Sequence, residues 1–270
     1  MSEHRVTVTM NAGVADVRLV RADKMNALDD AMFAALIETG ERLKEDRSVR
    51  AIVLSGEGRA FCAGLDTSNF GKMASGEPRG NTSLEAQKRT PGGANRAQHA
   101  VMVWREQPAP VIAAVHGVAY GGGFQLTLGA DMRFVTPDAK LSIFEINWGL
   151  VPDMAGIALL RGLVRDDFVR ELTYSGRIFS GEEALGLGIA TRVCADPRAE
   201  ALALAAQIAG KNPHAVRGAK RLINAMADAD QHEILKQETA EQIALIGSPN
   251  QVEAVMANMQ KRTPNFADVA

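Results

Sequence analysis

The sequence predicts an α/β core with a helical C-terminal part, and two observations support this prediction. Before residue 197, short apolar runs typical of buried strands alternate with glycine turns and helical segments, and this order recurs three times. From Pro197 onward Ala, Leu, Lys and Glu dominate and strand patterns disappear. We therefore expect residues 1–196 to form the core and residues 197–270 to form a helical region. A chain of 270 residues is long enough to bury a large core.

The first part of the chain contains a predicted hairpin, a helix and a buried strand. Residues 5–10 and 14–20 alternate polar and apolar side chains around an Asn-Ala-Gly turn, which predicts two antiparallel strands. Residues 29–45 carry apolar residues at helical spacing, with Asp29 as the expected N-cap. Residues 49–54 form a short apolar run, followed by a glycine turn, and are expected to be a buried strand.

The middle of the chain begins with a predicted loop and continues as mixed strands and helices. Residues 66–95 are polar and rich in glycine and proline, which indicates a long loop. The remaining elements are expected as a helix at 97–105, strands at 111–115, 132–135 and 140–143, and helices at 154–163, 165–175 and 181–187. The C-terminal helices are expected to break at residues 210–213 and 247–249, where glycine and proline cluster.

Composition and charge argue against several classes of protein. The formal net charge of −2 gives no electrostatic reason to expect nucleic acid or an anionic membrane as a partner. Cys62 and Cys194 form neither a disulfide framework nor a zinc spacing, so we expect no metal and a reducing compartment. The N-terminus is unlike a signal peptide, and no apolar run approaches the roughly 18 residues of a membrane span. A cytoplasmic protein is expected.

Glycine turns follow two of the buried strands. The segment Val111–Asp131 (VIAAVHGVAYGGGFQLTLGAD) runs from an apolar strand into three glycines and then a helix start. Unpaired N–H groups at a helix N-terminus stabilise negative charge on an oxygen, and glycine lets a ligand approach them closely. Ser55–Asp66 (SGEGRAFCAGLD) carries a similar turn, although Phe61 replaces the third glycine of a dinucleotide-binding pattern. The two turns could supply one N–H each to a single oxygen; simple close-packed turns are the alternative.

Two carboxylates lie in the strongly apolar segment Lys140–Gly156 (KLSIFEINWGLVPDMAG). Desolvation of Glu145 and Asp153 would raise their pKa values, and a raised pKa suits proton transfer near neutral pH. The alternatives are that Glu145 pairs with an arginine and that Asp153 caps the helix after Pro152.

Other conspicuous residues are given structural interpretations. His116 is expected to be a packed structural histidine, and Cys62, with no evident histidine partner, a small core residue. Trp104 and Trp148 are expected in the core or in a pocket wall. The basic cluster of Arg217, Lys220 and Arg221 is interpreted as a solvated helix face.

Taken together, the motifs resemble the crotonase superfamily, the enoyl-CoA hydratase/isomerase family. The matching segments occur in the family's order along nearly the whole chain: RADKMNAL, GRAFCAGLD, AVHGVAYGGGFQLTLGAD, FEINWGLVPDMAG, SGEEALGLGIATRV and MQKRTPNF. The resemblance implies a spiral of repeated ββα turns, a C-terminal helical trimerisation region, and homotrimers or dimers of trimers. It also implies an acyl-CoA thioester substrate, no further cofactor, and an enolate oxygen held by the backbone N–H groups of Leu65 and Gly122.

The resemblance also implies contacts with CoA. Lys24 and Ala27 fall in the loop that meets the nucleotide, and Arg59 falls where a basic residue approaches the phosphates. Ala63 and Asp66 flank the loop of the Leu65 donor, near the adenine and pantetheine. Lys261 and Phe266 match C-terminal positions that reach a neighbouring subunit's CoA.

The expected activity depends on the acid–base positions. Hydratases of the family resemble one another in holding a water between two glutamates, but here the first position is Gln125 and only the second, Glu145, is acidic. An amide cannot exchange a proton near neutral pH. Asp153 matches a second carboxylate of dienoyl-CoA isomerases, although those also carry an acid where Gln125 stands. We expect an isomerase in which Glu145, with Asp153, moves protons while Gln125 positions substrate or water. One alternative is a hydratase, or another lyase or hydrolase of the same family, and the other is a non-catalytic acyl-CoA-binding protein.

Overall fold

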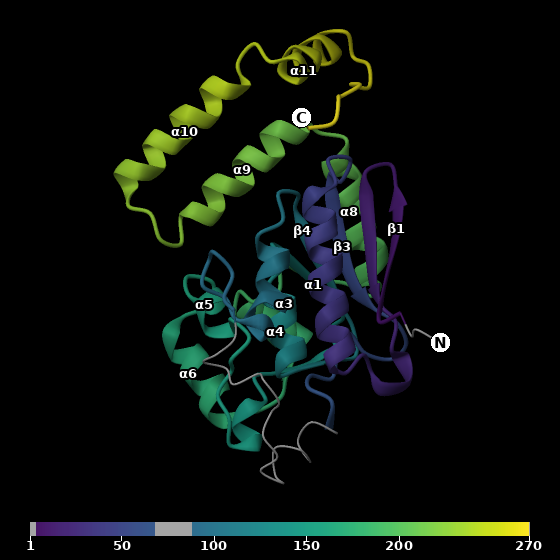
Figure 1. Cartoon of the computed structure of the whole chain (residues 1–270), viewed down its shortest axis with the longest axis vertical. Coiled ribbons are helices and arrows are strands. Elements are labelled where there is room, and N and C mark those ends of the chain that lie inside the picture. The colour runs from purple at the N-terminus through teal and green to yellow at the C-terminus, as the bar shows by residue number, and fades with distance from the viewer. Residues whose placement is uncertain (1–3, 68–87, 270) are drawn as a thin grey trace.

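The computed structural model describes residues 4–67 and 88–269, and these residues form two β-sheets surrounded by helices (Figure 1). The larger sheet has the strand order β1-β2-β3-β4-β6-β9, and the smaller sheet has the order β5-β7-β8. Most of the predicted loop at 66–95 lies outside the described residues. The α/β prediction is confirmed.

The larger sheet begins with the predicted hairpin and continues with parallel strands. β1 (Val6–Asn11) pairs antiparallel with β2 (Val14–Leu19), which confirms the hairpin. The parallel strands that follow are β3 (Ala51–Gly56), β4 (Val111–Val115), β6 (Met132–Val135) and β9 (Arg192–Val193). β3 begins and ends two residues later than the prediction of 49–54, because all six of its residues pair with β2. Parallel pairing of this kind places the ends of these strands at a common edge.

The smaller sheet makes the fold a spiral. It consists of β5 (Val118–Tyr120), β7 (Lys140–Ser142) and β8 (Phe179–Ser180). β4 is followed at once by β5, and β6 by β7, so the chain passes from the larger sheet to the smaller one in each turn. β5 was not predicted because three residues are too short for a period-two pattern to be recognised.

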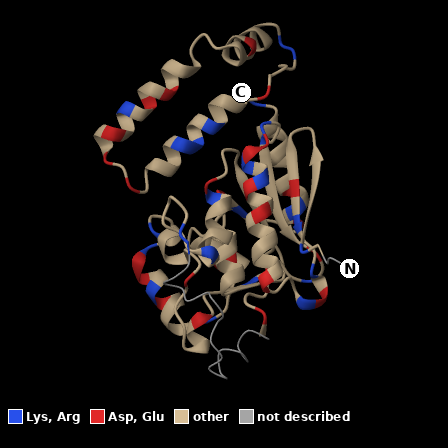
Figure 2. Ribbon diagram, in the orientation of Figure 1, with Lys and Arg blue, Asp and Glu red and all other residues tan. Residues whose placement is uncertain are grey.

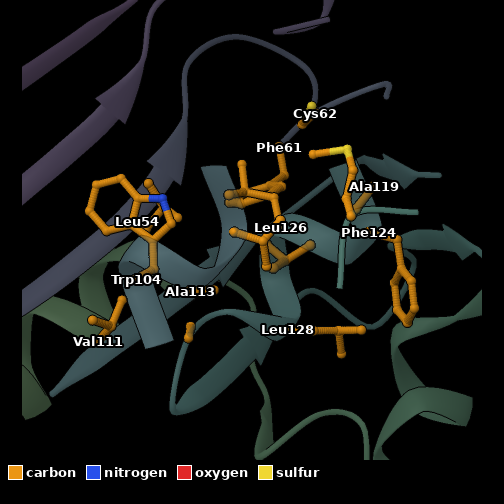
Figure 3. Packing of buried hydrophobic residues seen from close by; sticks show 14 of the residues in the cluster. Leu54, Phe61, Cys62, Trp104, Val111, Ala113, Ala119, Phe124, Leu126 and Leu128 are labelled. Atoms are coloured by element: carbon orange, nitrogen blue, oxygen red, sulfur yellow. The ribbon is translucent and has the colours of Figure 1, made fainter. Parts of the chain in front are cut away.

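Helices on one face of the larger sheet bury the main core. They are α1 (Asp30–Glu45), α3 (Arg96–Arg105) and α4 (Gly122–Leu128). The Asp29 side chain accepts a hydrogen bond from the N–H of Met32 at 2.8 Å, which confirms it as the cap of α1. Trp104 is fully buried against residues such as Leu54 and Leu126, as Figure 3 illustrates, so its predicted core position is confirmed. Cys62 lies in the same cluster, as predicted.

The opposite face of the larger sheet is covered by α8 (Pro197–Ala209). Its buried alanines, four residues apart, pack against a second cluster that includes Val53, Ile112 and Phe134. Small side chains at that spacing let a helix approach a sheet closely. The predicted division of the chain at residue 197 stays a prediction. The helix α8 lies beyond that position and nevertheless packs directly on the larger sheet.

Three further helices form an arm that extends away from the sheets (Figure 1). They are α9 (Pro213–Ala225), α10 (Gln231–Leu245) and α11 (Pro249–Met259), with α9 and α10 side by side. The predicted breaks at 210–213 and 247–249 are confirmed. A further break at 226–230 was not predicted, because it contains no glycine or proline; there the Asp230 side chain caps α10.

The interpretation of the basic residues of α9 as a solvated face is wrong for Lys220, whereas Arg221 is exposed as predicted. Figure 2 shows basic segments along α9, but Lys220 is only 7% exposed. Its ammonium donates to Asp131 Oδ2 at 2.7 Å and to the Ala109 carbonyl at 3.0 Å. Burial lowers the pKa of Lys220, and the Asp131 carboxylate opposes that effect. Arg221 instead pairs with Glu241 of α10.

The remaining helices are short. They are η1 (Ala22–Lys24), η2 (Glu145–Trp148), α5 (Gly156–Leu160), α6 (Asp166–Ser175) and α7 (Gly181–Gly186). α5 is shorter than the predicted 154–163. Trp148 is 51% exposed, so it lies outside the core, and its alternative place in a pocket wall stays a prediction. Within the described residues, no helix is both long and apolar enough to cross a membrane.

Replacement of Lys220 tests whether its buried ion pair holds the arm against the sheet. In Lys220→Met the Asp131 carboxylate loses its closest cation, so the free energy of unfolding should fall by about 3 kcal/mol, as when one partner of a buried pair is removed. Urea denaturation of the two proteins measures this difference. Arg221→Met is the matched control, because the Arg221 side chain is 60% exposed and its pair with Glu241 should contribute less than about 1 kcal/mol. Equal losses in the two variants would contradict this assignment.

Candidate active site

Glu145 is the carboxylate with the most unusual surroundings in the predicted site. It is the first residue of η2, and its Oε1 accepts a hydrogen bond from Gln125 Nε2 at 2.6 Å. Its Oε2 is buried and has no hydrogen-bond partner among the described residues. Burial raises the pKa of Glu145, the nearby Asp153 charge raises it further, and the hydrogen bond from Gln125 opposes both. A partly buried carboxyl with one unpartnered oxygen is well placed to give and take a proton.

Gln125 holds Glu145 in place through an amide whose oxygen is already occupied. The side chain is 1% exposed, and its Oε1 accepts hydrogen bonds from the N–H groups of Met154 and Gly156, both at 2.9 Å. A Cβ on Gly156 would lie 2.7 Å from that oxygen, so the contact requires glycine there. The amide therefore connects α4, the start of α5 and Glu145. Its oxygen is turned to the protein rather than outward to a substrate or a water.

The glycine turn before α4 leaves room and a free donor beside Glu145. Gly121 has φ +51 and ψ −121, a conformation that favours glycine, and a Cβ there would lie 3.2 Å from Glu145 Oε1. A Cβ on Gly122 would lie 2.7 Å from Met154 Sδ. As the first residue of α4, Gly122 has an N–H with no acceptor inside the helix. Gly121 N–H donates to the Ser142 carbonyl at 3.0 Å, which ties this turn to β7, just before Glu145.

The second predicted donor, Leu65, lies on a segment that runs against the same turn. Leu28 N–H donates to the Gly64 carbonyl at 2.8 Å, and Asp66 N–H donates to the Leu28 carbonyl at 3.0 Å, a parallel bridge. In such a bridge the N–H of the central residue, Leu65, points away from Leu28. Gly64 has φ +91, and a Cβ there would lie 2.5 Å from the Tyr120 carbonyl oxygen and 3.7 Å from Gly122 N. The two predicted donor segments are therefore neighbours in space.

The alternatives for the two carboxylates receive no support. Glu145 makes no ion pair with an arginine in the part of the chain that the structure describes. The cap residue of α5 is Ala155, in a left-handed conformation, and no side chain caps that helix. Asp153 is exposed, and its charge acts on Glu145. Chemically, the arrangement combines donors for a developing oxyanion with a proton-transferring carboxylate.

The residues predicted to meet the CoA nucleotide are arranged around the same loops. Lys24 and Arg59 are exposed, Ala63 is half-buried, and Ala27 is buried. Asp66 is also buried, and its Oδ2 accepts from Arg21 Nη1 at 2.5 Å. This pairing directs the Asp66 carboxylate toward Arg21, inside the protein. The contact of Asp66 with CoA stays a prediction.

The two C-terminal residues do not join this group within one chain. Lys261 is exposed after α11. Phe266 is buried in its own chain, and its carbonyl accepts from Arg50 Nη2 at 2.8 Å. Arg50 precedes β3, whereas the loop that carries Leu65 follows that strand. Lys261 and Phe266 therefore lie at the other edge of the larger sheet, and their reach to a neighbouring subunit stays a prediction.

Asn26 is a supporting residue that the sequence analysis missed. It is fully buried with φ +55, and its Nδ2 donates to the carbonyls of Glu57, Ala60 and Phe61 at 2.9–3.1 Å. It thereby joins the loop after β2 to the loop that leads to Leu65. The signal for it was an asparagine between apolar residues in RADKMNAL. Within residues 4–67 and 88–269, no three His, Cys, Asp or Glu side chains gather to hold a metal ion.

Comparisons with known proteins identify the family. Residues 9–269 match the family model described as Enoyl-CoA hydratase/isomerase. The chain is 32% identical over 253 residues to the mitochondrial Delta(3,5)-Delta(2,4)-dienoyl-CoA isomerase of Mus musculus, covering 92% of this chain and 77% of that protein. It is 33% identical over 245 residues to a probable enoyl-CoA hydratase of Bacillus subtilis, covering 89% and 90%.

A solved structure extends the agreement to the fold. The crystal structure of an enoyl-CoA hydratase from Mycobacterium smegmatis matches with a TM-score of 0.82 and 32% identity, covering 97% of this chain and 99% of that one. The α/β spiral and the sequence motifs thus agree with both comparisons, and the chain belongs to the enoyl-CoA hydratase/isomerase family, within the crotonase superfamily.

Proposed function

We propose that this protein is an isomerase that moves a double bond in the acyl chain of an enoyl- or dienoyl-CoA. The observation that carries the proposal is the Gln125–Glu145 hydrogen bond of 2.6 Å, because it places an amide where a water-activating pair needs a second carboxylate. One carboxylate with a free oxygen is sufficient to carry a proton from one carbon to another. The family's acyl-CoA substrate and the named dienoyl-CoA isomerase relative are consistent with this reaction.

The proposed reaction begins at the thioester. The thioester oxygen accepts hydrogen bonds from the N–H groups of Leu65 and Gly122, each typically worth about 3 kcal/mol as negative charge develops. Glu145 removes a proton from an acyl carbon, and the electron pair of the broken C–H bond forms the enolate. The same carboxyl then returns the proton to a carbon further along the chain, and the double bond is shifted with no net change in atoms. Asp153, whose charge raises the pKa of Glu145, assists the proton transfer.

Gln125 has a positioning role in this scheme, which differs from the role predicted from the sequence. Its oxygen accepts from Met154 and Gly156, so it offers no acceptor to a water near Glu145. Its amide fixes the orientation of the carboxylate through the bond to Oε1 and leaves Oε2 for the substrate. Hydration, the name carried by the Bacillus subtilis relative, is the competing activity. Non-catalytic binding of acyl-CoA is the third possibility, and substrate assays distinguish it from the two activities.

The CoA moiety is proposed to lie along the loops around Leu65. The exposed cations Lys24 and Arg59 would meet its phosphates, and Ala27 and Ala63 would border the adenine and pantetheine. These contacts need no further cofactor. The direction of the acyl chain is then from Leu65 toward Glu145.

The C-terminal arm is proposed to assemble the chain into trimers or dimers of trimers. Large apolar side chains are exposed along it, and they include Ile223 at 61%, Met226 at 65%, Ile243 at 69%, Ile246 at 65% and Met259 at 76%. Apolar residues gathered in this way on extended helices mark an interaction surface. Lys261, beyond α11, would then lie near a neighbouring subunit.

Substrate assays test the proposed reaction. The pure protein should convert 3-enoyl- or 3,5-dienoyl-CoA to its shifted isomer and add water to 2-enoyl-CoA only slowly. Glu145→Gln should lower kcat at least about 100-fold, the usual contribution of a placed carboxylate, while acyl-CoA affinity is retained. Glu182→Gln, at an exposed glutamate of α7, is the matched control. Fast hydration would refute the isomerase assignment, and full activity of Glu145→Gln would remove Glu145 from the mechanism.

The raised pKa of Glu145 predicts opposite effects of pH on rate and on stability. The isomerase needs the carboxylate, so kcat should rise with pH through a pKa above the ordinary 4.5 and then level off. The folded protein holds this proton more tightly than the unfolded chain, so the stabilising effect is present at low pH and is lost as pH rises through the raised pKa. The Tm of Glu145→Gln relative to wild type should therefore increase over that pH range. A constant difference in Tm would contradict the raised pKa.

The proposed assembly through the C-terminal arm predicts the molar mass of the protein in solution. Light scattering should give three or six chains for the wild type. Ile243→Glu combined with Ile246→Glu places charges on the exposed apolar surface and should shift the protein toward monomers. Gln231→Glu adds one such charge at an exposed polar position of α10 and should leave the mass unchanged. A wild-type monomer would refute the assembly.

A further inference from the structure

Glu145 lies on a short helix that is not held by burial in the core. The helix η2 contains no buried residue, and Ile146, Asn147 and Trp148 are all exposed. Gln125 bonds to the side chain of Glu145, but that bond does not fix the main chain that carries the carboxyl. A misplacement of about 1 Å can lower the rate of a reaction about 100-fold. A contact other than core packing must therefore fix the position of η2.

The carbonyl oxygen of Gly176 contacts the chain on both sides of Glu145. It accepts hydrogen bonds from Ser142 Oγ at 2.9 Å and from Asn147 Nδ2 at 3.2 Å. Ser142 precedes Glu145 in the chain, and Asn147 follows it. A carbonyl oxygen has two lone pairs, so it can accept both bonds at once. The segment 142–147 is thus tied at both of its ends to a single atom.

The smaller sheet fixes the Ser142 end of this segment. Ser142 is fully buried, and it is paired in register with Tyr120 of β5. Its own carbonyl accepts from Gly121 N–H at 3.0 Å, and the rings of Phe144 and Tyr120 are stacked with their centroids 5.2 Å apart. The main chain of Ser142 is therefore held independently of its hydroxyl. The hydroxyl connects this fixed strand to Gly176.

Gly176 is held in turn by the helices next to it. It caps the C-terminus of α6, where its N–H donates to the Leu172 carbonyl at 3.1 Å. The next residue, Arg177, pairs with Glu171 of α6 at 2.7 Å and with Glu183 of α7 at 2.6 Å. These bonds fix the turn on both sides of the Gly176 carbonyl.

A side chain at position 176 would displace η2. A Cβ on Gly176 would lie 2.5 Å from Asn147 Nδ2 and 2.6 Å from Ile146 Cγ2. These two residues come directly after Glu145 in the chain. Gly176 also has φ +59, a left-handed conformation that favours glycine. The position of η2 against α6 therefore depends on the absence of a side chain there.

We propose that the Gly176 carbonyl, with Ser142 and Asn147 as positioning residues, holds η2 where the Glu145 carboxyl reaches the acyl chain. The inference rests on the proposed function of Glu145 in proton transfer. Gln125 orients the carboxyl, whereas Gly176 fixes the main chain from which it projects. Loss of either bond to Gly176 lets the carboxyl move away from the reacting carbons. This lowers kcat and leaves the contacts with CoA, and hence KM, largely unchanged.

Kinetics of the full-length protein with 3-enoyl- or 3,5-dienoyl-CoA test this role. Ser142→Ala and Asn147→Leu each remove one hydrogen bond and should lower kcat about tenfold, with KM changed less than about twofold. In the Glu145→Gln background neither substitution should lower the residual kcat further, because both act through Glu145. Ser175→Ala is the matched control, at the exposed serine next to Gly176, and should keep the wild-type kcat.

A crystal structure of Gly176→Ala provides a readout that does not depend on turnover. The helix η2 should move away from α6, and the distance between Gln125 Nε2 and Glu145 Oε1 should increase beyond about 3.5 Å, the limit of a hydrogen bond. Ser142→Ala adds no atoms to the protein, and its crystal structure gives the second readout if Gly176→Ala does not fold. There η2 should have lost its wild-type position relative to β7.

Three outcomes would overturn the positioning role. The first is an unchanged kcat in both Ser142→Ala and Asn147→Leu while the wild type isomerises its substrate. The second is a loss that adds fully to that of Glu145→Gln, and the third is an unmoved η2 in the crystal structures. Failure of the proposed function is distinguishable from these, because the wild type would not isomerise or Glu145→Gln would keep full activity. The crystal structures would then still decide whether Gly176 positions Glu145.

Discussion

The site depends on direct contact between two stretches of main chain, residues 62–65 and 120–123. A Cβ on Gly64 would lie 2.5 Å from the Tyr120 oxygen, and one on Gly123 would lie 2.2 Å from the Cys62 oxygen, so no larger residue fits without displacing backbone. This contact places the N–H groups of Leu65 and Gly122 near each other. Asn26 donates to the carbonyls of Glu57, Ala60 and Phe61 and so fixes the path of the backbone that leads into the first stretch.

Glu145 combines a chemical advantage with an energetic cost. Removing a carboxylate from water is unfavourable unless it is hydrogen-bonded, and only one of its oxygens is. Gln125 provides that bond while its own oxygen is bound by two N–H groups of residues 154 and 156. The amide thus stabilises the carboxylate and does not compete for its proton. A second acid at that position would share a proton with Glu145 and change the chemistry that the site supports.

The arm and the sheet are joined by a polar contact inside an otherwise apolar core. Lys220 of α9 reaches Asp131 and the Ala109 carbonyl, next to the first residues of β4 and β6. Such a pair requires one geometry to satisfy its hydrogen bonds, so it fixes where the arm begins. The direction of α9 then influences which apolar side chains of α10 and α11 stay exposed. The two faces of the larger sheet also differ: one packs against α1, α3 and α4 in the main core, and the other packs against α8.

The sequence by itself determined the family, the hairpin, the cap of α1, most helices and the glycine turns, because these depend on local periodicity and on residues with special backbone conformations. It also indicated that Gln125 and Glu145 occupy the two acid–base positions of the family. Only the tertiary structure decided what Gln125 bonds to, that Asp66 turns inward to Arg21, that Lys220 is buried and that Trp148 is exposed. Each of these depends on contacts between residues far apart in the chain, from 20 for Gln125 and Glu145 to 111 for Lys220 and Ala109, and no local pattern encodes such contacts.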